Sequence, residues 1–221
     1  MIIVSGSPAT KTSQLVSYVG SNTSTTSTIA IPAHQAGDII VVTAFRREID
    51  VPTSIFAPSA GGTVPTWNAL GWIWGFAPTG TWTVGFLGCY AVATGSNMTS
   101  GTWTNATNMA VNVFRGSGAV TECYRANWST SQANSTASVQ LAATSKDYAN
   151  GTTFNNKMAV HCCSYANVTI GAPTGWILGS QTSYVTNYYL GGGGPQFTAT
   201  AQSLSSATGT ANIMYEVISY S

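Results

Sequence analysis

Short apolar and β-branched stretches, separated by turn-forming residues, run along the whole chain. No dozen residues repeat apolar positions at intervals of three and four without interruption by glycine, proline or β-branched residues, so helices are not expected. Alternating or continuous apolar runs instead predict strands over residues 13–19, 27–31, 38–45, 82–93, 102–115, 137–141, 158–166, 175–180, 183–189, 197–204 and 212–219.

Two of these segments predict different environments. Residues 38–45 are almost continuously apolar, as in a central strand that is covered on both faces. Residues 107–114 alternate, so one face of that strand is expected in the core. The apolar side would carry Met109, Val111 and Val113, and the other side Asn108, Asn112 and Phe114.

Many short strands with frequent turns and no helices between them predict an all-β fold, a β-sandwich of jelly-roll-like type. We expect a single domain over residues 1–221, with residues 1–30 as an edge strand and loop region. Residues 40–45 precede Pro65 and a Gly-Trp pair at 71–72, and residues 158–163 precede Pro-Thr-Gly-Trp at 173–176. Two such related halves are what a double Greek key produces.

Charge is scarce, because Asp, Glu, Lys and Arg make up 6% of the residues and the formal net charge is +1. No strong field exists to attract nucleic acid or anionic lipid, so neither is expected as a partner. The first residues lack the pattern of a secretory signal, and no apolar run is long enough to span a bilayer. Solubility usually depends on net charge, so some surface is expected to be covered by copies of the chain or by a partner. A monomer coated with serine and threonine is the alternative.

Few residues are suited to catalysis. The six acids are scattered, the chain has two histidines, and no GxSxG motif is present. We therefore expect no enzyme activity, no cofactor and no metal. Asp38 follows a glycine at the head of a strand and is expected to cap the turn through backbone N–H groups. His161 is expected to be a buried, hydrogen-bonded side chain.

The four cysteines, Cys89, Cys123, Cys162 and Cys163, have no zinc-type spacing. Buried free thiols are the first interpretation, and a disulfide formed after lysis or secretion is the second. Cys162 and Cys163 are adjacent, so on a strand they would point to opposite faces.

Two polar or aromatic clusters are candidate subunit interfaces. One is the charged group Arg46, Arg47, Glu48 and Asp50, whose alternative role is an exposed loop with local ion pairs. The other is Tyr184, Tyr188 and Tyr189, whose alternative role is an exposed hairpin. A third group is Trp67, Trp72, Trp74 and Trp82. Core and interface packing is the first interpretation of these tryptophans, and stacking against a host glycan is the second.

Several short motifs occur together in this chain. They are Ile-Pro-Ala-His-Gln-Ala-Gly-Asp at 31–38, Gly-Thr-Trp-Thr at 101–104, Val-Asn-Val-Phe-Arg-Gly at 111–116, Pro-Thr-Gly-Trp at 173–176 and the closing strand at 213–219. In these motifs the chain resembles β-sandwich structural proteins encoded by tailed bacteriophages. The resemblance covers much of the chain, but it carries no catalytic residue.

The resemblance implies a non-enzymatic virion protein made in the host cytoplasm and released by lysis. We expect a capsid decoration protein that forms a homo-oligomer and contacts other virion proteins. A tail component, or a receptor-binding module that uses exposed Trp and Tyr side chains on a host glycan, is the alternative. An enzyme acting on polysaccharide ranks last.

Overall fold

A computed structural model describes residues 11–49, 53–73, 82–131, 138–139, 157–165, 175–190, 202–203 and 210–221. These residues contain strands and no helix, which confirms the all-β prediction, and they include no helix able to cross a membrane. The strands are β1 (Ser13–Gln14), β2 (Val16–Ser24), β3 (Ile39–Ile49), β4 (Asn68–Ile73), β5 (Trp82–Val92), β6 (Asn108–Gly116), β7 (Val120–Ser131), β8 (Ser138–Val139), β9 (Lys157–Ser164), β10 (Trp176–Gln181), β11 (Val185–Leu190), β12 (Gln202–Ser203) and β13 (Thr210–Tyr220).

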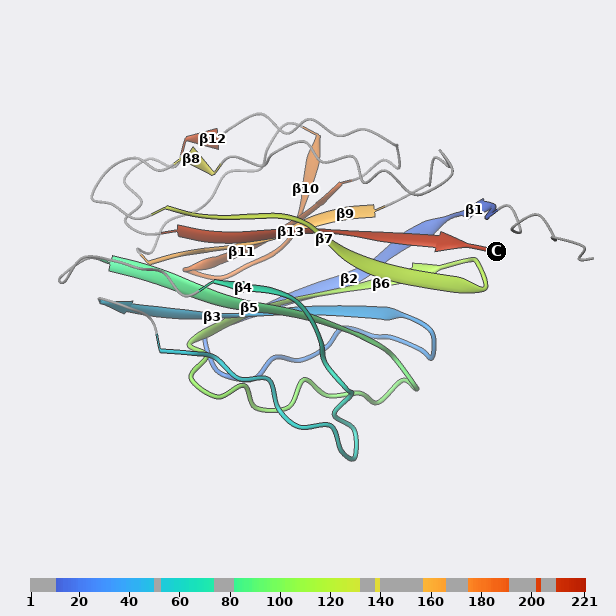
Figure 1. Cartoon of the computed structure of the whole chain (residues 1–221), viewed down its shortest axis with the longest axis horizontal. Helices are drawn as coiled ribbons and strands as arrows, with labels where there is room; N and C mark the ends of the chain where they lie inside the picture. The colour runs from blue at the N-terminus through green and yellow to red at the C-terminus, as the bar shows by residue number, and fades with distance from the viewer. Residues whose placement is uncertain are drawn as a thin grey trace, which may run out of the picture.

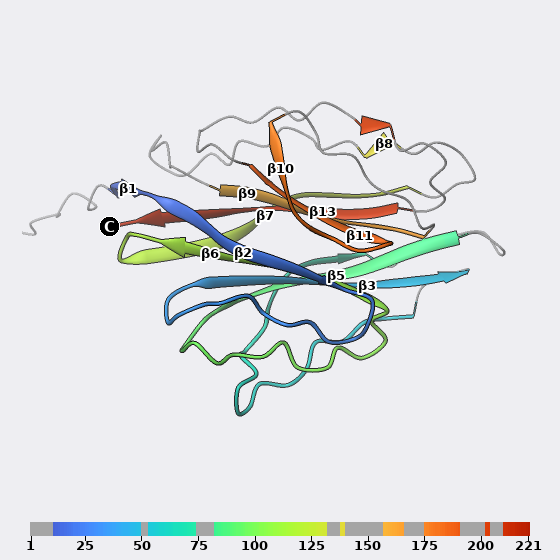
Figure 2. The same cartoon turned by 180° about the vertical axis from the view of Figure 1, so that it is seen from behind.

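Two antiparallel sheets pack face to face as a β-sandwich (Figure 1). The first sheet has the order β2-β6-β3-β5-β4, so β2 and β4 are its edges. In the second sheet β13 pairs with β7 on one side and with β9 on the other, and β11 and β10 follow β9. The short β1 extends this sheet beside β13, and β8 and β12 form a separate pair above it (Figure 2).

Each half of the chain builds one sheet, and the strand order repeats. The first half gives β2-β6-β3-β5-β4, and the second gives β7-β13-β9-β11-β10 in the corresponding places. The two matching halves expected from the sequence are therefore present. The order refines the jelly-roll expectation, because a jelly roll divides the strands of each half between both sheets. Here the described chain passes between the large sheets from β1 to β2 and from β6 to β7.

The residue pairing inside the two sheets repeats as well. Matching residues 40–45 with 158–163 makes Val41 of β3 equivalent to Ala159 of β9. Val41 lies opposite Tyr90 on β5, and Ala159 lies opposite Tyr189 on β11. The loose sequence match thus corresponds to an equivalent register in three dimensions.

Both faces of the first sheet are buried. Its inner face packs against the second sheet through residues such as Ile39, Val41 and Phe114. Its outer face is covered by loops, from which Ile29, Ile55, Met98 and Trp103 pack onto the sheet (Figure 1). The prediction that residues 38–45 are covered on both faces is confirmed.

The prediction of a single buried face for residues 107–114 is wrong. Met109, Val111 and Val113 pack under the covering loops, while Asn112 and Phe114 are also buried on the inner face. Asn112 is buried because its amide bonds the side chains of Asn187 and Tyr215 from the opposite sheet. A polar residue can lie in the core here because its side-chain amide has hydrogen-bond partners.

One strand prediction falls wholly on a loop, another falls partly on a loop, and two strands were not predicted. Residues 27–31 form a loop, in which the Ile29 N–H donates to Ser100 Oγ, and residues 102–107 form a loop before β6 begins at Asn108. Strands β4 and β7 were missed because both are sheet edges with few core positions, and β7 carries Glu122 and Arg125. Most of the predicted strands at 137–141 and 197–204 lies outside the described residues.

Candidate functional site

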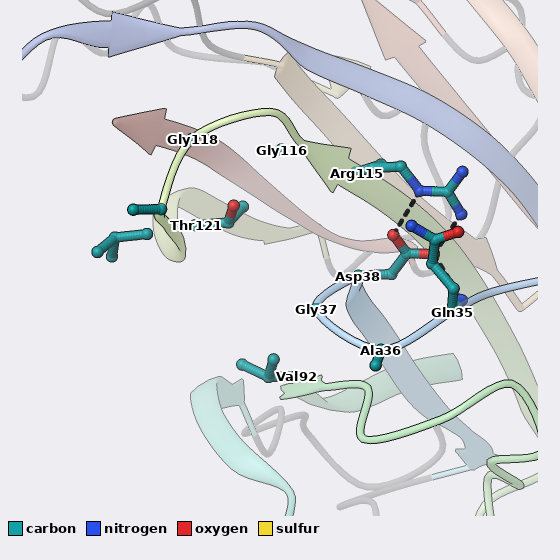
Figure 3. Close-up of a pocket in the computed structure, with 11 residues that line it drawn as sticks. Gln35, Ala36, Gly37, Asp38, Val92, Arg115, Gly116, Gly118 and Thr121 are labelled. Atoms are coloured by element: carbon teal, nitrogen blue, oxygen red, sulfur yellow. Dashed lines mark hydrogen bonds and ion pairs between the residues drawn. The ribbon is translucent and has the colours of Figure 1, made fainter. Parts of the chain in front are cut away.

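An open hollow of about 440 Å³ lies at one end of the sandwich, where β3 begins, β5 and β6 end and β7 begins. We call it the end hollow; Figure 3 shows it. It is lined by Gln35, Ala36, Gly37, Asp38, Val92, Arg115, Gly116, Gly118, Ala119, Val120 and Thr121. Residues far apart in the sequence therefore share one site.

Asp38 organises one wall of the end hollow. Gly37 takes a left-handed conformation (φ 89°), which glycine adopts without strain and which lets the chain turn into β3. The Gln35 N–H donates to Asp38 Oδ2 at 2.9 Å, so the prediction that Asp38 caps this turn is confirmed. The Asp38 side chain is 1% exposed.

Arg115 neutralises the buried carboxylate. Its Nε donates to Asp38 Oδ1 and its Nη2 to Asp38 Oδ2, both at 2.8 Å, in a two-pronged geometry that favours this pair (Figure 3). The hydrogen bonds that Arg115 donates to Asp38 hold the pKa of Arg115 above its ordinary value. Sequence reasoning missed this pair because 77 residues separate its members; they meet through the alignment of β3 with β6, in which Ile39 lies opposite Phe114.

Exposed apolar side chains also line the end hollow. Val92 and Val120 line the end hollow and are 48% and 39% exposed, and Ala36 and Ala119 are exposed as well. Leu15, 61% exposed, lies beside the β6–β7 turn, where its C=O accepts the Ser117 N–H at 2.9 Å. The site thus combines a neutral Asp–Arg pair with an apolar rim.

The two histidines are engaged inside the chain. His34 Nε2 accepts the Met98 N–H at 3.0 Å, and its Nδ1 lies 2.7 Å from Pro32 O. His161 lies between Thr43 Oγ1 and the Tyr215 hydroxyl, as predicted for a buried, hydrogen-bonded histidine. Burial lowers the pKa of His161 to about 3, so its ring is neutral. The described residues bring together no group of three or more His, Cys, Asp or Glu side chains that could hold a metal.

The charged cluster of β3 forms contacts within the chain. Arg46 bonds Glu48 and donates to Asn105 O at 3.2 Å, and the Thr53 N–H donates to Glu48 at 2.7 Å. Desolvation raises the pKa of Glu48, but the hydrogen bonds from Arg46 and Thr53 outweigh it and hold that pKa below its ordinary value. Asp50 lies outside the described residues.

The structure brings the two predicted interface clusters together. The Arg47 guanidinium lies 3.4 Å from the centre of the Tyr184 ring and donates from Nε to Tyr165 O at 3.1 Å. Arg47 therefore joins the ends of the two sheets. Tyr188 is buried within the chain, and Tyr189 stacks on Tyr18 with ring centres 3.7 Å apart. The role of these residues between subunits stays a prediction.

The four candidate glycan-stacking tryptophans differ in their surroundings. Trp67 is half-buried and packs against Trp103, with ring centres 5.5 Å apart. Trp72 on β4 is 58% exposed. Trp82 opens β5 opposite Ile49, and Trp74 lies outside the described residues. Of the two whose side chains are described, Trp72 alone is widely accessible.

All four cysteines are buried free thiols, as in the first of the two sequence interpretations. Cys163 faces the space between the sheets, where it packs with Val185 and Ile213. Cys162, on the other face of β9, is buried too. Desolvation raises the pKa of both thiols, that of Cys162 to about 12.

Comparison with known proteins identified no relative of this chain. No family model, no curated protein and no solved structure matches this chain.

Proposed function

We propose that this chain is a non-enzymatic structural protein of a bacteriophage particle, which assembles as a homo-oligomer and decorates the capsid. The phage context rests on the motif resemblance, above all on residues 31–38 and 111–116. In the structure these two motifs lie side by side, because Asp38 ends the first and Arg115 belongs to the second, and their side chains bond. Two of the five motifs behind the resemblance thus contribute residues to the end hollow.

The end hollow is the feature of the structure that best supports a role in assembly. Exposed apolar side chains gather around a pair whose charges cancel, on a chain in which 6% of the residues are charged. Exposed apolar side chains on a protein of low charge favour association with another protein. Three groups with catalytic potential are meanwhile engaged within the described part of the chain: Asp38 is paired with Arg115, and His34 and His161 each form hydrogen bonds.

Sedimentation velocity over a range of concentrations tests this proposal. We expect a species whose mass is a multiple of 22.9 kDa, which also co-sediments with capsids that lack the protein, from the phage whose genome encodes it. A single 22.9 kDa species at every concentration, with no binding to capsids, would contradict the proposal.

Exposed Trp72 favours a second candidate, a tail or receptor-binding module that holds a host glycan. An indole with more than half of its surface open to solvent can stack on the apolar face of a sugar. Titration with host polysaccharide would then quench tryptophan fluorescence in the wild type but not in Trp72→Ala. Unchanged fluorescence in the wild type would exclude the glycan-binding module and would not affect the proposed capsid role.

A further inference from the structure

We propose that the end hollow is the surface through which two copies of this chain associate. This inference rests on the proposed function and assigns the contact to named residues. The position of Arg115 is fixed by its ion pair with Asp38, whose side chain is almost inaccessible to solvent. A guanidinium held in this way presents its remaining donors in a constant direction.

Arg115 has unused donors. A guanidinium carries five N–H groups, and the Asp38 carboxylate takes two of them, one from Nε and one from Nη2. The other three have no acceptor in the described part of the chain, and the side chain is 42% exposed. A partner that supplies carbonyl, amide or hydroxyl oxygens would satisfy these donors, at little cost in side-chain entropy because the arginine is already ordered.

The residues that line the end hollow limit which classes of molecule can bind there. The eleven lining residues include no aromatic side chain, so the end hollow offers no stacking platform for a sugar. Their charges, Asp38 and Arg115, cancel each other, so they do not select phosphate groups or a strongly charged protein. An uncharged polypeptide surface with exposed oxygens and small apolar groups fits both the donors and the rim.

This chain itself presents such a surface. Its composition is poor in charge and rich in serine, threonine and asparagine, whose side chains carry acceptor oxygens. A second copy therefore complements the end hollow in charge and in hydrogen-bonding groups. Contact there would also cover Val92 and Val120, which are otherwise exposed to water.

A pair of matched substitutions tests the location of this interface. Val92 on the rim and Leu178 on the edge strand β10 are each 48% exposed, so a glutamate at either position disturbs the folded chain similarly. We expect Val92→Glu to weaken self-association at least tenfold in sedimentation equilibrium, because a carboxylate would be buried beside an apolar partner. Leu178→Glu should leave the association constant within twofold of the wild type. Val120→Glu repeats the test should Val92→Glu fail to fold.

The other outcomes separate the two proposals. If the wild type forms an oligomer that both rim variants leave intact, the end hollow is not the interface, whereas the proposed function stands. If Leu178→Glu alone dissociates it, the interface lies at β10. If the rim variants keep the oligomer but no longer bind capsids, another virion protein occupies the end hollow. A wild type that is always monomeric and does not bind capsids overturns both proposals together.

Discussion

Thr43 and His161 occupy equivalent positions in the two halves of the chain, and their side chains bond each other, with Thr43 Oγ1 and His161 Nδ1 2.8 Å apart. Thr43 lies on β3 between Gly88 and Ala110, and His161 lies on β9 between Asn187 and Ile213. The central strands of the two sheets thus meet at corresponding residues. The contact belongs to a buried network that continues from His161 to Tyr215, Asn112 and Asn187.

His161 should make the stability of the protein depend on pH. Burial lowers the pKa of His161 from 6.5 to about 3, so below pH 6.5 the unfolded chain takes up a proton that the folded chain does not. The contribution of this neutral histidine to stability is complete above pH 6.5. It is lost as the pH falls toward 3, at up to about 1.4 kcal/mol per pH unit. Urea unfolding between pH 5 and 8 measures this slope.

Two variants separate the contribution of His161 to this pH dependence from that of His34. His161→Gln should lower the free energy of unfolding at pH 8 and also flatten its dependence on pH between 5 and 6.5. His34→Gln, which alters the other histidine, should retain the slope that His161 causes. An unchanged slope in His161→Gln would show that the ring titrates normally in the folded protein.

The Asp38–Arg115 pair should stabilise the end hollow through its two hydrogen bonds. Asp38→Asn and Arg115→Ala should each lower the free energy of unfolding. A double-mutant cycle should give a coupling of about 1 to 2 kcal/mol, near the lower end for charged hydrogen bonds because Arg115 is partly solvated. Unfolding in urea measures all four proteins of the cycle. A coupling below about 0.3 kcal/mol would mean that the pair orients the side chains without stabilising the fold.

Arg47 should hold the two sheets together at the opposite end of β3. Arg47→Lys keeps the positive charge but loses the planar contact with Tyr184 and the two-pronged donation to Tyr165 O. We expect the free energy of unfolding to fall by about 1 to 2 kcal/mol. Arg125→Lys, at an exposed position on β7, is the control and should change stability by less than about 0.5 kcal/mol. Equal effects of the two variants would argue against a specific role for Arg47.

The four thiols should be unreactive in the folded protein. All four cysteines are buried, and desolvation raises the pKa of Cys89 and of Cys162 to about 12, so little thiolate is present at neutral pH. A thiol reagent should label the native chain slowly and should label four groups after unfolding without reductant. Two labelled groups after unfolding would reveal a disulfide in the isolated protein.

The sequence by itself determined the all-β class and the strongest strands, and it indicated two related halves. Turn residues and β-branched runs act locally, so they identify segments such as β3 and β13 without knowledge of their neighbours. The capping role of Asp38 and the buried state of His161 also follow from local context. The edge strands β4 and β7 escaped prediction because one neighbouring strand and a partly exposed surface leave a weak apolar pattern.

Tertiary structure alone decided which distant residues meet. The alignment of β3 with β6 places Arg115 on Asp38, and the packing of the two sheets places Arg47 on Tyr184 and Thr43 on His161. Loops cover Met109, Val111 and Val113 on the outer face of the first sheet, and the second sheet covers Asn112 and Phe114 on the inner face. A strand expected to have one buried face therefore has two. Such contacts depend on strand order and on layers between segments far apart in the chain, and a local pattern contains neither.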